Sequence, residues 1–287
     1  MKWLYLALMP LCSAFKVTAQ GYFSKDKLKT TADILKFNAF MSLFAAISLI
    51  IFTVRALPSF ETVLYALAFG GLSVTFQLVY VNAFKTGPIS LTSTICNFSI
   101  IISITFSIIA YNEPITPFKI IGFFLIILSF LLIPSTEKNG AKTSFKWFFL
   151  SILAAVLSGT TNVIQIHFSH SAFSGEKECL NALSYIFSTI ICFSIIPFIK
   201  GKQPLYKTDK KLGLALPFIG LALGLYNLFY VCAMEIVPAS EFVPSLSALT
   251  ILVSISMSCI TLKEKLSIKQ LFGVLTTIGA VIIVNLQ

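Results

Sequence analysis

Lys16 is the side chain of this sequence best placed to do chemistry, because it lies inside a long apolar run. It stands 13 residues from Trp3 and nine from Lys25, about 20 Å and 14 Å along a helix. A lysine side chain reaches only about 6 Å and falls short of either end of such a helix. An ionisable group at this depth is by default functional, binding an anionic group or carrying a coupling charge. The alternative is a structural lysine paired with backbone carbonyls or a carboxylate.

Other polar side chains recur within the apolar runs at helical spacing. One stripe of the first run consists of Ser13, Lys16 and Gln20. The predicted equivalent in the second half of the chain is Gly159, Asn162 and Ile166, with Gln165 adjacent. Two pairs, Gln77 with Tyr80 and Asn227 with Tyr230, occupy matching positions in two further runs.

Matching polar groups in related helices predict one shared cavity, since polar side chains in lipid must face protein or water. The alternative is that they hold helices together through interhelical hydrogen bonds. The predicted substrate-binding residues are Lys16, Gln20, Gln77, Tyr80, Asn97, Asn162, Gln165, Tyr226, Asn227 and Tyr230.

The remaining carboxylates, histidines and cysteines predict no catalytic, metal or cofactor site. Glu241, one turn after Pro238, is a candidate coupling or gating residue, although a carboxylate there also suits the helix dipole. Glu113 and Glu264 fall at helix links, where they are interpreted as structural. His167 and His170 lack a converging set of ligands, the six cysteines form no CxxC pair, and no GxxxxGK[ST] phosphate loop implies ATP.

The composition places these residues in a membrane. Hydrophobic residues make up 57% of the chain and charged residues 11%, whereas a soluble domain carries about a quarter charged residues. The net charge of +10 does not indicate nucleic acid, because the lysines lie in short links between apolar runs. Met1 to Ala14 has features of a signal peptide but lacks a clean cleavage site, so it is assigned to a helix of the mature protein.

The apolar runs predict ten membrane-spanning helices. They cover about 3–23, 33–54, 61–84, 89–111 and 117–134 in the first half, and about 147–168, 179–199, 212–234, 239–262 and 268–286 in the second. The short links leave no room for a soluble domain. The predicted fold is therefore an all-α polytopic membrane protein.

The two halves are related by an internal repeat. Tyr80 to Pro88 recurs as Tyr230 to Pro238, 150 residues later, and Gly70 is matched by Gly220 at the same offset. This pattern predicts two five-helix repeats, residues 1–140 and 141–287.

The distribution of lysines predicts that the second repeat is inverted. In the first half, Lys25, Lys27, Lys29 and Lys36 flank the first link, whereas Arg55 is alone at the second. In the second half the bias reverses, and the basic cluster is Lys200, Lys202, Lys207, Lys210 and Lys211. The basic links therefore lie on one side, which the positive-inside rule predicts to be cytoplasmic with both termini outside.

A segment with the same order of landmarks occurs in each half of the chain. The first copy runs from Ala83 to Ile133, with a Pro after the Ala, a Glu-containing link and Gly122. The second runs from Ala233 to Val284 through Leu262-Lys263-Glu264-Lys265-Leu266 and Gly273. These segments resemble the EamA repeat of the drug/metabolite transporter superfamily, although at Tyr111-Asn112-Glu113-Pro114 the first copy departs from the family's Leu-Gly-Glu pattern. The resemblance specifies the superfamily but not the substrate.

The predicted function is a secondary transporter in the plasma membrane that moves small polar or amphipathic metabolites, among them amino acids, by alternating access. Its predicted partners are a small-molecule solute and the lipid bilayer, with no nucleic acid and no ATP-binding partner. A non-transporting scaffold or sensor is an alternative, as is an intramembrane lipid enzyme, although the latter needs a converging acid/base or metal set. Energy coupling, direction and oligomeric state are left open by the sequence.

Overall fold

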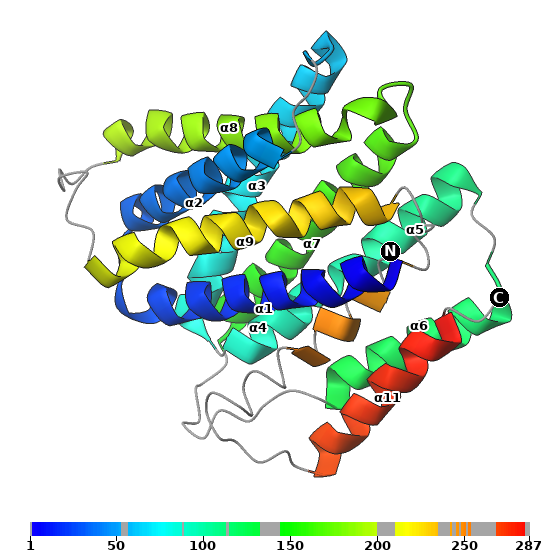
Figure 1. Cartoon of the computed structure of the whole chain (residues 1–287). Helices are drawn as coiled ribbons and strands as arrows, with labels where there is room; N and C mark the ends of the chain where they lie inside the picture. The colour runs from blue at the N-terminus through cyan, green and yellow to red at the C-terminus, as the bar shows by residue number, and fades with distance from the viewer. Residues whose placement is uncertain are drawn as a thin grey trace.

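The computed structural model describes residues 2–52, 57–87, 89–112, 115–132, 144–199, 210–234 and 268–284, together with positions 242, 245–246, 248–250 and 252–253 (Figure 1). These residues form helices joined by short links. The helices of the first half are α1 (Lys2–Asp26), α2 (Thr31–Phe52), α3 (Phe60–Thr86), α4 (Ile89–Asn97), α5 (Ser99–Tyr111) and α6 (Pro117–Leu132). Those of the second half are α7 (Phe145–Ser169), α8 (Lys177–Ile195), α9 (Lys210–Met234) and α11 (Ile268–Val284), with 3-10 turns η1 (Ser174–Glu176) and η2 (Ile196–Phe198).

Nine of the ten predicted spans coincide with these helices, and the described positions between 242 and 253 are helical too. Within the described residues, five helical segments are long and apolar enough to cross a membrane: residues 31–51, 60–86, 145–169, 174–198 and 211–230. The polytopic, all-helical class is therefore confirmed for the described residues. The full count of ten spanning helices stays a prediction.

One predicted helix is interrupted. The span 89–111 divides at Phe98 into α4 and α5, where the Phe98 N–H donates to Ile95 and the Ile101 N–H donates to Phe98, both at 3.0 Å. These i to i+3 bonds replace the α-helical pattern for one step. The prediction of one continuous helix here was wrong, because a local change of hydrogen bonding leaves no mark on an apolar run.

Side-chain caps explain where several helices begin. The Ser59 hydroxyl accepts from the Thr62 N–H at the start of α3, and the Ser144 hydroxyl accepts from the Trp147 N–H at 3.1 Å at the start of α7. Such caps satisfy amide groups that have no partner within the helix. Pro197 follows the end of α8, where the chain continues as η2, so this helix ends earlier than the predicted 199.

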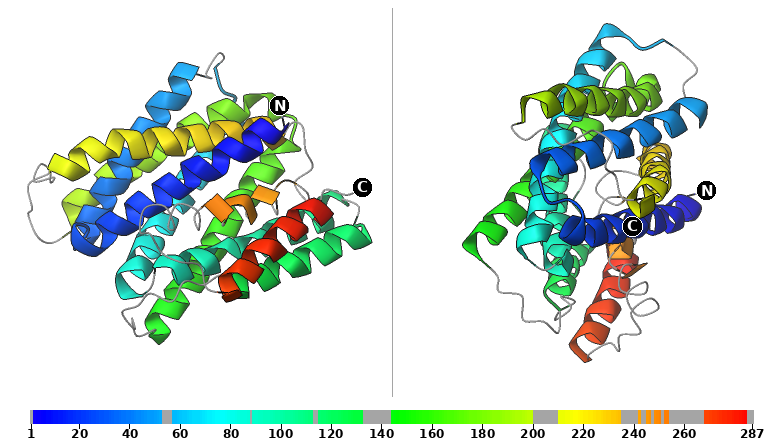
Figure 2. Two further views of the ribbon diagram at one scale, coloured as in Figure 1. Left: turned by 60° about the horizontal axis from the view of Figure 1, so that its bottom comes forward. Right: turned by 90° about the vertical axis from the view of Figure 1, so that its left-hand side faces the viewer.

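Helices of each half pack mainly on helices of the other half, and equivalent helices make equivalent contacts, as expected for two related repeats. The α3 helix packs on α7 and α8, and its counterpart α9 packs on α1 and α2. Among the other large contacts, α2 packs on its counterpart α8, α6 on its counterpart α11, and α5 on α7. Figures 1 and 2 show α6 and α11 side by side at one edge of the bundle.

Two glycines show this relation at atomic detail. A Cβ built on Gly70 would meet the Ser184 carbonyl oxygen at 2.7 Å, the Phe187 Cβ at 3.0 Å and the Ser188 nitrogen at 3.1 Å. A Cβ built on Gly220 would meet the same three atom types of Met41, Phe44 and Ala45, at 2.7, 2.5 and 3.2 Å. The equivalent residues of α2 and α8 are all 143 positions apart (184 − 41, 187 − 44, 188 − 45). Both contacts therefore use the same close helix approach.

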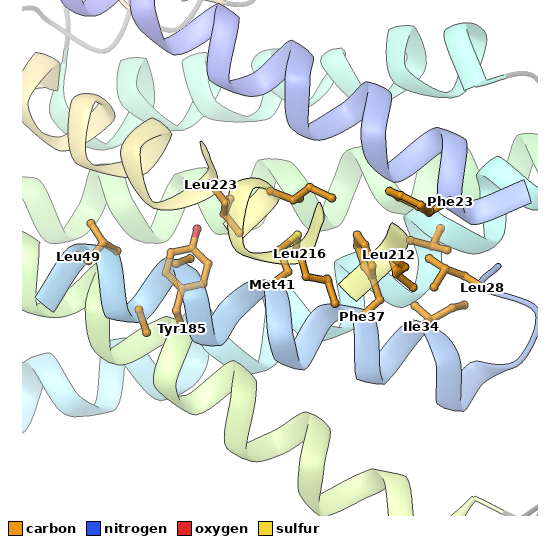
Figure 3. Close-up of a cluster of buried hydrophobic side chains, with 14 of the residues drawn as sticks. Phe23, Leu28, Ile34, Phe37, Met41, Leu49, Tyr185, Leu212, Leu216 and Leu223 are labelled. Carbon is orange, nitrogen blue, oxygen red and sulfur yellow. The ribbon is translucent and has the colours of Figure 1, made fainter. Parts of the chain in front are cut away.

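A large apolar cluster joins α1, α2, α8 and α9 (Figure 3). Phe23 of α1 and Leu28 of the following link pack with Ile34 and Phe37 of α2, and all four are buried. Leu212 and Leu216 from the first half of α9 belong to the same cluster. The bundle is thus filled by side chains at the end where the α1–α2 link lies.

Candidate functional site

A cavity of about 200 Å³ lies among the helices. Its described lining comes from α1, α3, α4, α5, α7, α8 and α9, with Leu246 and Thr250 from the segment after α9. Nine of the ten predicted substrate-binding residues line this one cavity: Lys16, Gln77, Tyr80, Asn97, Asn162, Gln165, Tyr226, Asn227 and Tyr230. The tenth, Gln20, is fully buried behind them.

Lys16 carries the only charge among the described lining residues. It lies near the middle of α1, and Cys96 of α4 lines the same cavity. No carboxylate or carbonyl partner of Lys16 is found in the described part of the chain. An ammonium in such a place is costly unless a partner compensates it, and an anionic ligand in the cavity can do so.

The side-chain amides of four predicted residues form hydrogen bonds between helices. The Gln20 amide of α1 donates to the Gln77 side-chain oxygen of α3. On the other side, the Gln165 amide of α7 donates to Asn181 at 2.9 Å and to Asn227 at 3.4 Å. These amides are thus partly committed to the scaffold, as the alternative interpretation of the sequence proposed.

Tyr185 of α8 is a cavity residue that the sequence analysis missed. Its hydroxyl accepts from the Asn227 side chain at 2.6 Å, and the same amide group also donates to the Leu223 carbonyl at 2.9 Å. At the offset of 143 its counterpart is Ser42, a different residue type, so no repeat signal marked it.

The predicted stripe on α7 was displaced by one residue. Ile166 is fully buried in an apolar cluster, and a Cβ on Gly159 would meet Ile102 at 2.8 Å, so neither faces the cavity. The lining residues of this helix are Ser158, Thr161, Asn162 and Gln165. An offset of 145 matches them to α1 (158 − 13, 161 − 16, 165 − 20), which places Thr161 opposite Lys16. A trial of neighbouring offsets on the sequence would have found this match.

The two matched tyrosines differ in their hydrogen bonds. Tyr80 shares a hydrogen bond with Ser93 at 3.1 Å and stacks on Phe76, with ring centroids 5.1 Å apart. Tyr230 is 3% exposed, and its hydroxyl has no hydrogen-bond partner among the described residues. A buried hydroxyl without a partner is unfavourable, which leaves Tyr230 able to donate to a ligand.

Hydrogen-bond accounting divides the predicted set into two groups. Within the described chain, one group has no side-chain hydrogen bond: Lys16, Asn97, Asn162, Tyr226 and Tyr230. The other group is already bonded to protein: Gln20, Gln77, Tyr80, Gln165 and Asn227.

The histidines lie outside the cavity lining. The Tyr111 hydroxyl and the Nδ1 of His167 share a hydrogen bond at 2.8 Å, and the Tyr111 ring stacks on His170 at 3.8 Å. The described residues contain no group of three His, Cys, Asp or Glu side chains that could hold a metal ion. Glu241, Glu113 and Glu264 lie outside the described residues, as do Lys200 to Asp209.

Comparison with known proteins identifies both repeats and the fold. The model of the EamA-like transporter family matches residues 2–134 and again residues 145–286. A solved crystal structure superposes with a TM-score of 0.71 at 12% sequence identity, covering 98% of this chain and 96% of that one. This likeness concerns the fold alone. No curated protein sequence matches the chain.

Proposed function

The chain belongs to the EamA-like transporter family and is a multi-pass membrane transporter of the drug/metabolite transporter superfamily, and we propose that it is a plasma-membrane secondary carrier for small amphipathic metabolites that bear a carboxylate. Amino acids are the substrate class that we put first. The carrier works by alternating access, with its substrate in the cavity shared by two inverted repeats, residues 1–140 and 141–287. It uses no ATP.

The observation that carries this proposal is one ammonium beside polar groups that have no side-chain hydrogen bond among the described residues, all lining one cavity. Lys16 supplies the positive charge, and Asn97 of α4 and Asn162 of α7 supply amides with free capacity. A carboxylate is the anion that an ammonium and neutral donors bind in such a site. The volume of about 200 Å³ is below the roughly 300–1,000 Å³ of pockets for drug-sized ligands, which favours a small metabolite.

The rest of the lining favours an amphipathic solute. Leu223, Tyr226 and Tyr230 of α9 line the cavity together with Leu246. Thr161 takes the position that corresponds to Lys16 in the second repeat, so the cavity has one cationic side only among its described residues. A solute with one anionic end and one apolar or aromatic end matches this asymmetry.

Flux through purified protein tests the proposal. A thermal-shift screen of metabolites selects ligands, and uptake of the best ligand is then measured in proteoliposomes against protein-free vesicles. We expect saturable uptake without ATP for carboxylate-bearing solutes, and none for the corresponding amides. Stabilisation without uptake would favour the sensor or scaffold, and chemical conversion of added lipid would favour an enzyme.

A further inference from the structure

A second, smaller pocket lies next to the cavity, between α7, α8 and α9. It shares Gln165 and Tyr230 with the cavity and extends to Ser169, Lys177 and Asn181. Its volume is about 10 Å³, which is room for about one water-sized group or one carboxylate oxygen. The pocket thus continues from the cavity towards the start of α8.

The start of α8 favours an anion. Lys177 is the first residue of this helix of 19 residues, whose N-cap residue Glu176 forms no capping hydrogen bond with it. The Glu176 carboxylate is hydrogen-bonded to the start of α3 instead, where it accepts from the Ser59 N–H at 2.8 Å and from the Ser59 hydroxyl at 2.9 Å. The helix N-terminus carries partial positive charge, which adds to that of the lysine, and the first-turn carboxylate of Glu178 opposes both.

Tyr230 gives the second, independent indication of a ligand. Its ring is 3% exposed, it lines the small pocket, and its hydroxyl has no hydrogen-bond partner among the described residues. The counterpart Tyr80 is bonded to Ser93 instead. A donor without a partner is therefore held between the cavity and the start of α8.

The corresponding place in the first repeat is closed. Ser24 and Ile34 correspond to Ser169 and Lys177 (169 − 145, 177 − 143). Both are buried, at 1% and 0% exposure, whereas Ser169 and Lys177 are half-buried. The cluster with Ile34 and Phe37 in Figure 3 fills that end. The pocket is thus present at one end of the bundle only among the described residues. In the first repeat the apolar Ile34 takes the position that Lys177 has in the second.

We propose that Lys177, Ser169 and Tyr230 form an outer site that receives the anionic group of the solute between Lys16 and the face of the bundle where η1 lies. This inference rests on the proposed function for the identity of the solute. In the outer site the carboxylate accepts hydrogen bonds from the Tyr230 hydroxyl and from the lysine end of the pocket. Lys177 is then a residue for anion selectivity at the entrance.

Charge-selective labelling tests the outer site without a transport assay. The Ser169→Cys protein is treated in detergent with the sulfonatoethyl or the trimethylammonium-ethyl methanethiosulfonate, and labelling of Cys at 169 is followed by mass spectrometry. We expect the anionic reagent to react faster. Lys177→Gln should lower the ratio of the two rates by about threefold or more, since a unit charge a few ångströms away changes the local potential by that order. Glu178→Gln should raise the ratio, and Lys146→Gln, an exposed lysine at the start of α7, should leave it unchanged.

The outcomes separate the outer site from the proposed function. If Lys177→Gln leaves the ratio of the two labelling rates unchanged, the outer site is refuted, even where transport that depends on Lys16 has been established. If the protein transports nothing but the ratio responds to Lys177 and not to Lys146, the anion site stands and the carrier proposal fails. A reagent-inaccessible position 169 in both charge forms would show that the pocket is closed and would also overturn the inference.

Discussion

Replacement of Lys16 by methionine separates a binding role from a structural role. Methionine keeps a long unbranched side chain but removes the charge and its hydrogen bonds. Lys16 lines the cavity and has no partner among the described residues, so the ammonium is a cost in the empty protein. We therefore expect Lys16→Met to leave the melting temperature unchanged or to raise it.

The same change should weaken substrate binding strongly. A hydrogen bond to a charged group contributes about 1.5–3 kcal/mol, and every 1.4 kcal/mol is tenfold in affinity. We expect the Kd of a carboxylate-bearing substrate to rise about 10- to 150-fold and flux to fall to background at low substrate. Lys16→Arg, which retains the charge, should keep part of the affinity, and Lys146→Met at an exposed position should change nothing.

Ligand-induced thermal shifts and proteoliposome uptake measure both effects on the same preparations. Normal uptake by Lys16→Met would refute the assignment of Lys16 to the substrate. A clear fall in the melting temperature of the unliganded variant would identify Lys16 as a structural lysine, whose partner the substitution had left unpaired.

Three further predictions concern packing, the cavity and orientation. Gly70→Ala should destabilise the protein by about 1–3 kcal/mol, because its Cβ would lie 2.7 Å from the Ser184 carbonyl oxygen. Gly71→Ala, whose Cβ would meet nothing within 4 Å beyond the local helix, should be neutral or stabilising in thermal unfolding. Tyr185→Phe leaves the Asn227 amide short of one acceptor, so it should lower stability by about 1 kcal/mol, and an unchanged melting temperature would contradict the assigned bond. A cysteine at Lys202 should resist membrane-impermeant thiol reagents in intact cells, and rapid labelling would reverse the assigned orientation.

The helices and the general place of the site could be predicted because both depend on patterns that the bilayer imposes. Long apolar runs need no tertiary contact to be recognised, and polar residues such as Gln77 and Asn227 stand out within them. Their common offset of 150 residues indicated that they face the same space. The structure places both side chains on one cavity.

The sequence could not predict which polar side chains of the site are hydrogen-bonded to other helices and which are not. Gln165 and Asn162 have similar side chains on one helix, but only Gln165 reaches Asn181 and Asn227. The offset also differs between helix pairs, at 150 for Gly70 and Gly220 but 145 for Ser13 and Ser158, because the links between helices differ in length. The stripe on α7 was predicted at an offset of 146 (159 − 13, 162 − 16, 166 − 20), one more than the offset that the structure shows, and was therefore displaced by one residue.

The contacts of α3 and α9 show that the helices that pack together are not the helices of one repeat. The α9 helix lies against α1 and α2 of the first repeat, and α3 lies against α7 and α8 of the second. Each of these three-helix groups therefore contains helices from both repeats. A gene encoding one repeat alone supplies neither group, so an ancestor of that length would have needed a second copy of itself to bury these faces. The covalent link between the repeats keeps together helices that would otherwise have to associate as separate chains.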